Sequence, residues 1–578
     1  MSTSTCLSFS LFREQTNQEL QDIIKKLPQS KNKAILTFPS YNENYSLRLI
    51  SRDIQQQYFR GICGLKDIKE TQNEDVIVVI SPSDRNTVDE ICTSFKRIPN
   101  YLKVLLLIPR NTALTQQAIE ENGFKSVQSM PKNKQLEIWV HEFHADFLSL
   151  DDDFFVLPCI NTFYQVEVEN DFNDLYSAAR ALAKIQSVFG IIPQVFTLGS
   201  SSSRVYQLMN GILDQARISK TSLPQIDSLI LIDRKVDLAT PFATQMPFES
   251  FVDELFGIDY GILSYDNKNI IFSNGTPFFK EIRSLPIKDL VEYILKVRDE
   301  INDAKKNLNE LKYLSGQEFR KRYLKIQEIS AESYQNNLDA AFKIYEDITK
   351  IAGEKHPVLN SLLSRELDLM KNQEPLIDII EKYALILGDW STAIRLICLQ
   401  SAVGKPLKKK IIETIEKEIF SEFGEEASES LITLEKLKLL STNQYIDFAQ
   451  LSKQLSLFES TGVEGDDELL NVCCNYVPLT VRLIQKATTN DWPGKWVKPF
   501  EEKSFPLEKY GEQTKQNSED EIRHILVFFV GGITLSEMLY IRELEKLVFQ
   551  DKVQFIIGST DIINNTKLVN QICPFLSK

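Results

Sequence analysis

The chain has 578 residues, of which 43% are hydrophobic and 25% are charged, and its formal net charge at pH 7 is −14. At roughly 100 to 200 residues per domain, this length predicts three or four domains, each with enough apolar material for a core. The acidic balance disfavours nucleic acid or an anionic membrane as a direct partner, because both are negatively charged.

The first third of the chain alternates between predicted strands and helices. The segments 34–38, 75–80 and 103–108 are short, rich in β-branched residues and apolar on both faces, as buried parallel strands are. A helical segment is predicted at 116–124, and the segment 136–143 is expected to start another layer. This alternation predicts an α/β domain.

A second group of α/β elements follows. Apolar residues at helical spacing fill 174–190, and Gly190 supplies a C-terminal stop for that helix. Strands are predicted at 193–199 and 228–233. After Pro247 the pattern changes to that of an amphipathic helix, with proline at its start.

From about residue 285 to 486 the pattern is almost entirely helical. Two runs of apolar residues repeat in steps of about four and three, which is the spacing of a heptad seam. The runs are Leu290, Ile294, Val297, Ile301, Ala304, Leu308 and Leu311, and then Tyr334, Leu338, Ala341, Tyr345 and Ile348. Such a seam serves either internal packing or the docking of a partner helix, and periodicity alone favours internal packing.

Predicted strands return near the end of the chain. The segments 524–532 and 553–560 flank a helix that begins with a capping box of Thr534 and Glu537. A strand–helix–strand unit needs both faces of its strands covered. We therefore expect these late strands to complete a sheet that begins before residue 233, which makes the helical block an insertion.

Cysteine usage and the N-terminal residues indicate a reduced, cytosolic protein. The eight cysteines include no C-x-x-C pair, and the first 15 residues lack the basic start and long apolar core of a signal peptide. No apolar run approaches the roughly 20 residues that span a bilayer. We expect any membrane association to be indirect, through partners.

Motifs for nucleotide, hydrolase and metal chemistry are missing from the sequence. It contains no Walker A loop, no G-x-G-x-x-G fingerprint and no G-x-S-x-G elbow. A glycine pair in 527–537 and a serine run in 198–204 each join a strand to a helix, but a tight turn and a helix cap explain them more simply than an anion site. His141 and His144 are spaced i, i+3 in a strand-like segment, which disfavours zinc. We expect no metal and no cofactor.

The stretch 228–250 holds the one candidate for catalysis. Asp233 ends a predicted strand, and such an aspartate can accept a phosphoryl group. The phosphohydrolase pattern with that nucleophile needs D-x-D, whereas Asp233 and Asp237 are four residues apart with Arg234 between them. Because an arginine forks to a carboxylate, a structural clamp explains these residues better. We expect Arg234 to pair with a nearby acid, of which Asp237 is the obvious one.

The stretch 231–258 resembles the signature of the SM family, the cytosolic proteins that chaperone SNARE assembly. Four further stretches, 174–196, 394–410, 476–485 and 527–537, agree in order with the vacuolar branch of that family. The signature positions that this sequence carries are Asp233, Arg234, Asp237, Pro241, Gln245, Asp253, Glu254, Gly531, Gly532 and Glu537. Pro247 and Phe248 depart from the branch, which usually has Thr-Tyr there, and the 290–350 region agrees only in pattern.

The resemblance implies a fold that is α/β plus all-α: an arch-shaped three-domain protein, with two α/β parallel-sheet domains and a large helical insertion. The implied domains are an α/β domain one over 1–130, a discontinuous α/β domain two over 131–233 and 487–578, and a helical domain three over 234–486 with a protruding helical hairpin at about 290–350.

The resemblance also implies a function without catalysis. In that family, domain one and the helical hairpin frame a cleft that binds SNARE motifs and so templates SNARE complex assembly. The vacuolar branch is a subunit of the HOPS and CORVET tethering complexes at late endosomes, lysosomes or vacuoles, where it docks on another core subunit. The implied partners are SNARE proteins and core tether subunits, with no nucleic acid, and the implied location is cytoplasmic, peripheral to those membranes.

Candidate SNARE-binding residues come from the hairpin around 317–350. By position and residue type, Arg320, Arg322 and Lys325 are expected to offer charge contacts, and Tyr334 is expected to offer an apolar anchor. Two alternatives stay open at this point: a pure structural tether subunit without SNARE templating, and a phosphohydrolase that uses Asp233.

Overall fold

The computed structural model describes most of the chain. The described residues are 7, 9–27, 34–38, 44, 48–65, 68, 76–81, 85–97, 103–129, 137–159, 161–216, 224–266, 268–306, 320, 324, 331–354, 359–459, 467–512 and 522–577. They fall into two compact units, a smaller one over Leu7–Pro158 and a larger one that begins at Cys159.

The smaller unit is built on a parallel sheet. Its strands are β1 (Ala34–Phe38), β2 (Phe59–Gly64), β3 (Val76–Ile80), β4 (Lys103–Ile108), β5 (Lys125–Val127) and β6 (Glu137–Glu142). They lie in the order β2-β1-β3-β4-β6-β5, and every neighbouring pair is parallel. The unit also contains the helices α1 (Ser10–Ile24), α3 (Arg52–Tyr58), α4 (Arg85–Lys96) and α5 (Ala113–Glu121), and an antiparallel hairpin of β7 (Leu148–Asp151) and β8 (Phe154–Val156).

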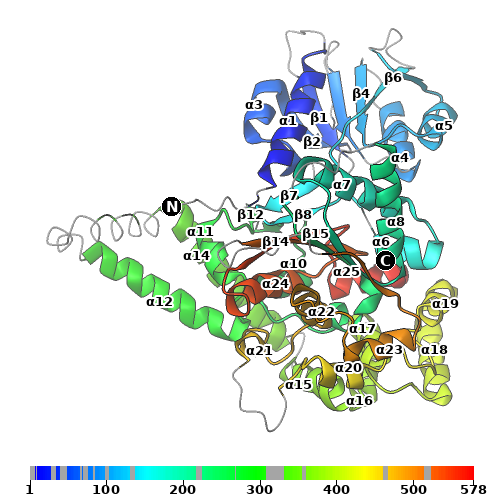
Figure 1. Cartoon of the computed structure of the whole chain (residues 1–578), viewed down its shortest axis with the longest axis vertical. Coiled ribbons are helices and arrows are strands. Elements are labelled where there is room, and N and C mark those ends of the chain that lie inside the picture. Colours follow the sequence, from blue (N-terminus) through cyan, green and yellow to red (C-terminus); the bar gives the residue numbers. More distant parts are fainter. Residues whose placement is uncertain are drawn as a thin grey trace. The chain divides into compact units, whose positions relative to one another are not determined.

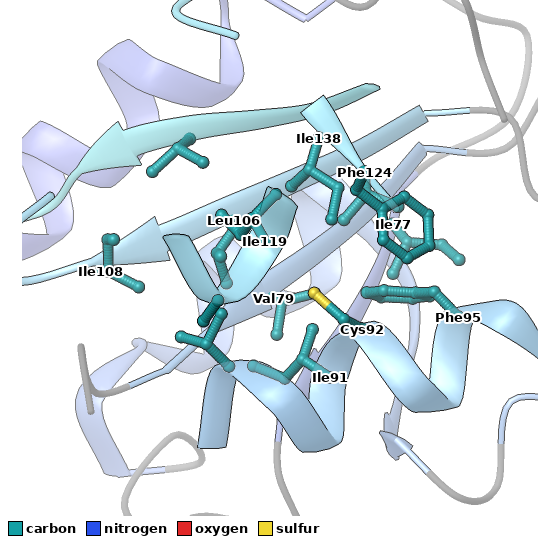
Figure 2. Packing of buried hydrophobic residues seen from close by; sticks show 14 of the residues in the cluster. Ile77, Val79, Ile91, Cys92, Phe95, Leu106, Ile108, Ile119, Phe124 and Ile138 are labelled. Atoms are coloured by element: carbon teal, nitrogen blue, oxygen red, sulfur yellow. The ribbon is translucent and has the colours of Figure 1, made fainter. Parts of the chain in front are cut away.

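The core of the smaller unit lies between this sheet and the helices α4 and α5 (Figure 2). Side chains from β3, β4 and β6 meet those of the two helices there: Ile77, Val79, Leu106, Ile108, Ile138, Ile91, Cys92, Phe95 and Ile119. Burial raises the pKa of the Cys92 thiol to about 12, so this cysteine stays protonated and acts as a packing residue. Each large apolar side chain removed from water contributes about 1.5–3 kcal/mol to folding.

The strands predicted in this region are confirmed, with one correction. β1, β3 and β4 match the predicted segments, and α5 covers most of the predicted helix. The expectation that 136–143 starts another layer is wrong, because β6 pairs with both β4 and β5 inside the same sheet. Its apolar run, Ile138 to Val140, is buried on both faces, as in the other parallel strands. The smaller unit therefore continues past residue 130 to Pro158.

The larger unit contains a sheet made from two distant segments of the chain. Its strands are β13 (Leu507–Gly511), β9 (Gln194–Leu198), β10 (Ser228–Asp233), β14 (Arg523–Val530) and β15 (Val553–Ser559), in that spatial order. The pairs β9–β10, β10–β14 and β14–β15 are parallel, and β13 is antiparallel to β9. The late strands thus complete a sheet that begins before residue 233, as predicted.

Helices make up most of the rest of the larger unit (Figure 1). They are α6 (Thr162–Tyr164), α7 (Asn173–Phe189), α8 (Ser200–Gln215), α9 (Ala239–Phe242), α10 (Phe248–Phe256), α11 (Pro277–Ile282), α12 (Ile287–Lys306), α14 (Glu332–Glu354), α15 (Leu359–Asn372), α16 (Ile377–Glu381), α17 (Trp390–Val403), α18 (Lys409–Phe423), α19 (Ser428–Lys436), α20 (Phe448–Gln454), α21 (Glu468–Val472), α22 (Leu479–Thr488), α23 (Lys498–Glu501), α24 (Leu535–Leu547) and α25 (Asn565–Ile572). A short antiparallel hairpin joins β11 (Ile262–Tyr265) to β12 (Lys268–Ile271). Within the part of the chain that the structure describes, no helix has the length and apolar character to span a bilayer.

The two heptad seams face inward. α12 packs against α14, and both helices are green in Figure 1. The buried positions are Leu290, Ile294, Val297 and Ile301 on α12, and Tyr334, Leu338, Ala341 and Ile348 on α14. The side chains of Ala304, Leu308 and Leu311 lie outside the described residues. Where the structure describes them, the seams thus serve internal packing.

The turn between β9 and α8 requires a glycine. Gly199 has a φ of +97°, a region that residues with a Cβ rarely adopt. A Cβ at this position would lie 2.4 Å from the Cβ of Asp233 on the neighbouring strand. The backbone N–H of Gly199 also donates a hydrogen bond to the carbonyl of Pro506 (2.8 Å), which fixes the turn.

We expect Gly199→Ala to lower the free energy of unfolding by about 2–4 kcal/mol, because it combines backbone strain with a clash. Gly211→Ala is the matched control, since Gly211 lies in α8 with no atom within 4 Å of an added Cβ. That control should stabilise the protein by about 0.5–1 kcal/mol. Denaturant unfolding of both variants measures the difference, and equal stabilities would contradict the role given to Gly199.

Candidate functional site

Arg234 is the centre of a buried polar junction at the C-terminal end of β10. Its side chain is fully buried. The guanidinium forks onto the carboxylate of Glu537 at the start of α24, with Nη1–Oε2 at 2.8 Å and Nη2–Oε1 at 3.1 Å. Its Nε donates to the carbonyl of Asp237 (2.9 Å). A two-pronged, charge-assisted contact of this kind fixes both position and orientation.

The main partner of Arg234 differs from the one expected. Asp237 lies 3.9 Å from Nη2 of Arg234, which is a longer contact than either contact to Glu537. The Asp237 carboxylate instead accepts hydrogen bonds from the N–H (3.0 Å) and the hydroxyl (2.6 Å) of Thr240. Asp237 therefore caps the turn that leads into α9, and Glu537, far away in sequence, takes the guanidinium.

Glu537 joins three chain segments. Besides Arg234, it accepts hydrogen bonds from the N–H and hydroxyl of Thr534 (both 2.9 Å), which complete the predicted capping box. It also accepts from the hydroxyl of Thr480 on α22 (2.6 Å). The segment after β10, α22 and the start of α24 are thus tied through one carboxylate.

The electrostatics of the junction depend on Arg234. Burial raises the pKa of Asp237, and the positive charge of Arg234 opposes that rise. Burial lowers the pKa of Arg234 itself, but Glu537 and Asp237 outweigh this effect, so its pKa is raised and the guanidinium stays charged. The buried guanidinium of Arg234 therefore interacts favourably with two buried carboxylates, those of Glu537 and Asp237.

Asp233 acts as a helix cap. It is 3% exposed, and its Oδ2 accepts from the N–H of Ser201 in the first turn of α8 (2.9 Å). Its Oδ1 accepts from the N–H of Lys235 (3.0 Å). Asp233 thus occupies the place near the serine run where an anion would bind. A buried carboxylate with both oxygens engaged is not poised for nucleophilic attack.

The paired glycines allow the close approach to Arg234. Gly531 has a φ of +97°, and a Cβ there would lie 2.9 Å from the Cβ of Arg234. The carbonyl of Gly532 lies 3.4 Å from Nη1 of Arg234 and accepts a hydrogen bond from it. The turn after β14 therefore needs a glycine at 531 because the arginine passes beside it, and a glycine at 532 because an added Cβ there would lie 2.6 Å from Cγ2 of Ile563.

The remaining signature residues strengthen the same connection between distant segments. Pro241 is buried within α9. The long-range hydrogen bonds run from Ser536 Oγ to Gln245 Oε1, from Asn564 Nδ2 to Asp253 Oδ2 (2.8 Å), and from Asn565 Nδ2 to Glu254 Oε1 (2.8 Å). The signature positions therefore form a structural joint between the segment after β10 and the last part of the chain.

The candidate SNARE-binding residues are not part of this joint. Arg320 is exposed, whereas Arg322 and Lys325 lie outside the described residues. Tyr334 is 5% exposed, and its ring packs edge-on against Phe278 at a centroid distance of 5.2 Å. Its hydroxyl donates to Glu281 (3.2 Å). The ring of Tyr334 is thus engaged in internal packing, and the partner role of all four residues stays a prediction.

Sequence reasoning missed two further buried ion pairs. Arg395 pairs with Glu366 (2.6 Å), and Arg283 pairs with Glu249 through two contacts of 2.7 and 2.9 Å. Arg395 is the one charged residue in a helix whose other residues are mostly apolar and nearly all buried. A lone arginine in such a helix needs a buried partner, and that pattern was the available signal.

Replacing Arg234 by methionine should destabilise the protein by about 3–5 kcal/mol, because two buried carboxylates lose their cation. Arg298→Met is the control, since Arg298 pairs with Asp339 at the surface (3.2 Å) and should cost less than about 1 kcal/mol. Denaturant unfolding at pH 7.5 gives both values. A cost for Arg234→Met no larger than that of the control would contradict the clamp.

The cost of Arg234→Met should also depend on pH. Without Arg234, the pKa of folded Asp237 rises further above its unfolded value of about 3.9. A group with a raised folded pKa contributes its full stability below the unfolded pKa and loses it as pH rises through the folded pKa. The difference in free energy of unfolding between wild type and variant should therefore become smaller as pH falls from 8 to 5. Denaturant unfolding curves at several pH values measure this difference.

Comparison with known proteins assigns the chain to a family. The family model described as the Sec1 family matches residues 43–571. Vacuolar protein sorting-associated protein 33A of Rattus norvegicus is 26% identical over 499 residues, which cover 80% of each chain. The protein of the same name from Drosophila melanogaster is 26% identical over 521 residues, covering 81% of this chain and 82% of that one.

Solved structures show the same fold. The SM protein Vps45 in complex with the Qa SNARE Tlg2 has a TM-score of 0.60 at 14% identity, over 98% of each chain. The Unc18–syntaxin 1 complex from Monosiga brevicollis also gives 0.60, at 13% identity over 99% of this chain and 100% of that one. Because the family match covers most of the sequence, including every residue of the polar junction, this chain belongs to the Sec1 family of SM proteins, which are non-enzymatic trafficking proteins.

Proposed function

We propose that this chain is a SNARE-binding chaperone that templates SNARE complex assembly in vesicle tethering and fusion. It would act at late endosomes, lysosomes or vacuoles as a subunit of a HOPS- or CORVET-type tethering complex. The names of its relatives support the vacuolar sorting role, and two SM proteins of the same fold have been solved in complex with SNAREs. The three-domain division predicted from the sequence is part of this proposal.

The observation that carries the proposal is the braced helix pair α12–α14. Its seam is buried, and Arg298 of α12 contacts α14 through Asp339 (3.2 Å) and through the ring of Phe342, 4.4 Å from its guanidinium carbon. The outer face of α12 carries Leu295, which is 50% exposed. A rigid helical surface with exposed apolar side chains suits the docking of another helix.

Templating follows from the entropy of the proposed ligand. SNARE motifs are disordered alone and lose chain entropy when they zipper together. A surface that holds two motifs parallel and in register removes part of that barrier before the bundle forms. Arg320 is exposed and Leu324 is 54% exposed, so these two residues present charge and apolar surface to solvent.

Charge reversal in this segment tests the platform. The variant Arg320→Glu, Arg322→Glu and Lys325→Glu should weaken binding of purified SNARE motifs by about tenfold or more at low salt, because each change turns attraction into repulsion. Tyr334 is left unchanged, because its ring packs against Phe278. Fluorescence anisotropy with labelled SNARE motifs measures the affinity.

The control alters the net charge by the same amount elsewhere. Lys405, Lys408 and Lys409 are exposed around the start of α18, and their replacement by glutamate should leave SNARE affinity within about twofold. An equal loss of affinity in both triple variants would indicate a net-charge effect. Unaltered affinity in the first variant would remove the platform from this segment.

Docking on a core tether subunit calls for a second surface. Phe420 on α18 is 49% exposed and Ile432 on α19 is 66% exposed, and a short helical turn, Gly424–Ala427, joins these two helices. Large apolar side chains so exposed to water favour a protein interface. This surface is our candidate for the contact with the tethering complex.

The double variant Phe420→Ser and Ile432→Ser should reduce co-purification with core tether subunits at least about fivefold, since apolar anchors carry much of an interface's affinity. SNARE binding by the purified variant should stay intact. Leu114→Ser, at an equally exposed apolar residue of α5, serves as the control. A protein that binds core subunits but no SNARE motif would instead be a pure structural tether.

A further inference from the structure

A cavity of about 150 Å³ lies within the larger unit, where α10, α14, α15, α17 and α25 meet. Phe251, Leu255, Ile348 and Val569 supply apolar wall, and Glu254 and Arg395 line it with charged groups. A cavity of this volume accommodates a small organic molecule of about the size of benzene. Its two charged groups, Glu254 and Arg395, determine which class of ligand it can bind.

The charge of Arg395 is already matched. Its Nη2 lies 2.6 Å from Oε1 of Glu366, and its Nη1 donates to the carbonyl of Phe242 (2.7 Å). The N–H of Thr244 donates to the other oxygen of Glu366 (2.9 Å). Because Arg395 and Glu366 neutralise each other directly, the cavity has no free cation from this pair to offer an anionic ligand.

Glu254 has a different environment. Its Oε1 accepts from the N–H of Gln245 (3.1 Å) and from Nδ2 of Asn565 (2.8 Å), which are both uncharged donors. Among the described residues, no lysine or arginine forms an ion pair with Glu254, and no hydrogen-bond donor reaches its Oε2. Burial raises the pKa of Glu254 well above its usual range, although the more distant charge of Arg395 opposes this rise. One carboxyl oxygen of Glu254 therefore has no protein donor among the described residues, and a cation beside it would favour the ionised form of the group.

We propose that this cavity binds a small organic cation, whose ammonium group donates to Oε2 of Glu254 and whose apolar body packs on Phe251, Leu255, Ile348 and Val569. A single carboxylate is too few ligands for a metal ion. An ammonium group on a compact apolar body satisfies both the charge and the shape of the cavity. This inference does not depend on the proposed function.

Occupation of the cavity would connect two parts of the larger unit. Ile348 belongs to α14 of the braced helix pair, whereas Val569 belongs to α25 in the C-terminal segment. A molecule that contacts both would stabilise their arrangement, because any ligand that binds only the folded state raises its stability. A metabolite bound in the cavity would therefore stabilise the position of the C-terminal part of α14.

The test uses 2-phenylethylamine and its neutral counterpart 2-phenylethanol with the full chain. The amine should raise the melting temperature in a concentration-dependent way, and calorimetry should give it an affinity at least about tenfold higher than the alcohol, as expected for a charge-assisted hydrogen bond. Equal affinities, or no binding of the amine at millimolar concentration, would overturn the proposal.

Two variants locate the site. Glu254→Gln keeps an acceptor oxygen for Gln245 and Asn565, so it should fold, and it should lose the preference for the amine over the alcohol. Thr566→Trp places a large side chain at an exposed position that lines the cavity, and it should weaken the binding of both compounds. Retention of the amine preference in Glu254→Gln would place the binding site elsewhere and refute the assignment.

Discussion

The contact between Arg234 and Glu537 holds together two segments that lie far apart in the chain. Arg234 directly follows β10, and Glu537 lies in the first turn of α24, the helix that follows β14. The ion pair therefore lies at the carboxyl ends of these two parallel strands. Burying a guanidinium is costly unless its partners surround it. Here a forked carboxylate and two backbone carbonyls do so, and the arginine therefore selects one arrangement of the two segments.

This constraint also fixes the base of the helical insertion. The insertion leaves the sheet after β10 and returns to it through β13, β14 and the elements around them. Thr480 and Arg234 both donate hydrogen bonds to Glu537. The start of the insertion after β10 and α22, one of its last helices, are therefore held by the same carboxylate. The chain therefore leaves the sheet and returns toward it beside one buried carboxylate.

The sequence predicted those features that depend on neighbouring residues or on repeated burial. β3 and β4 could be predicted because an unbroken apolar run is typical of a strand covered on both faces. The capping box at Thr534 was visible because its two residues lie three positions apart. β2 and β13 were missed because both are edge strands with mostly exposed or half-buried residues, which leaves no such run.

Partners that meet only in the fold could not be predicted from spacing. Asp237 was the obvious neighbour of Arg234 in sequence, yet its oxygens are engaged by Thr240, and the fork goes to Glu537. Tyr334 was chosen as a surface anchor, but heptad spacing cannot distinguish a ring that faces a partner from one that packs on Phe278. Family resemblance identified the signature positions without showing which pairs they form.

The geometry of the polar junction also explains why a strand-terminal aspartate here serves structure. Catalysis by a carboxylate requires a lone pair that a substrate can reach. Both oxygens of Asp233 accept backbone N–H groups, and those of Glu537 accept from Arg234, Thr480 and Thr534. Acids saturated in this way hold chain segments in place, so the same residue types that suggest an active site in the sequence form a joint in the folded protein.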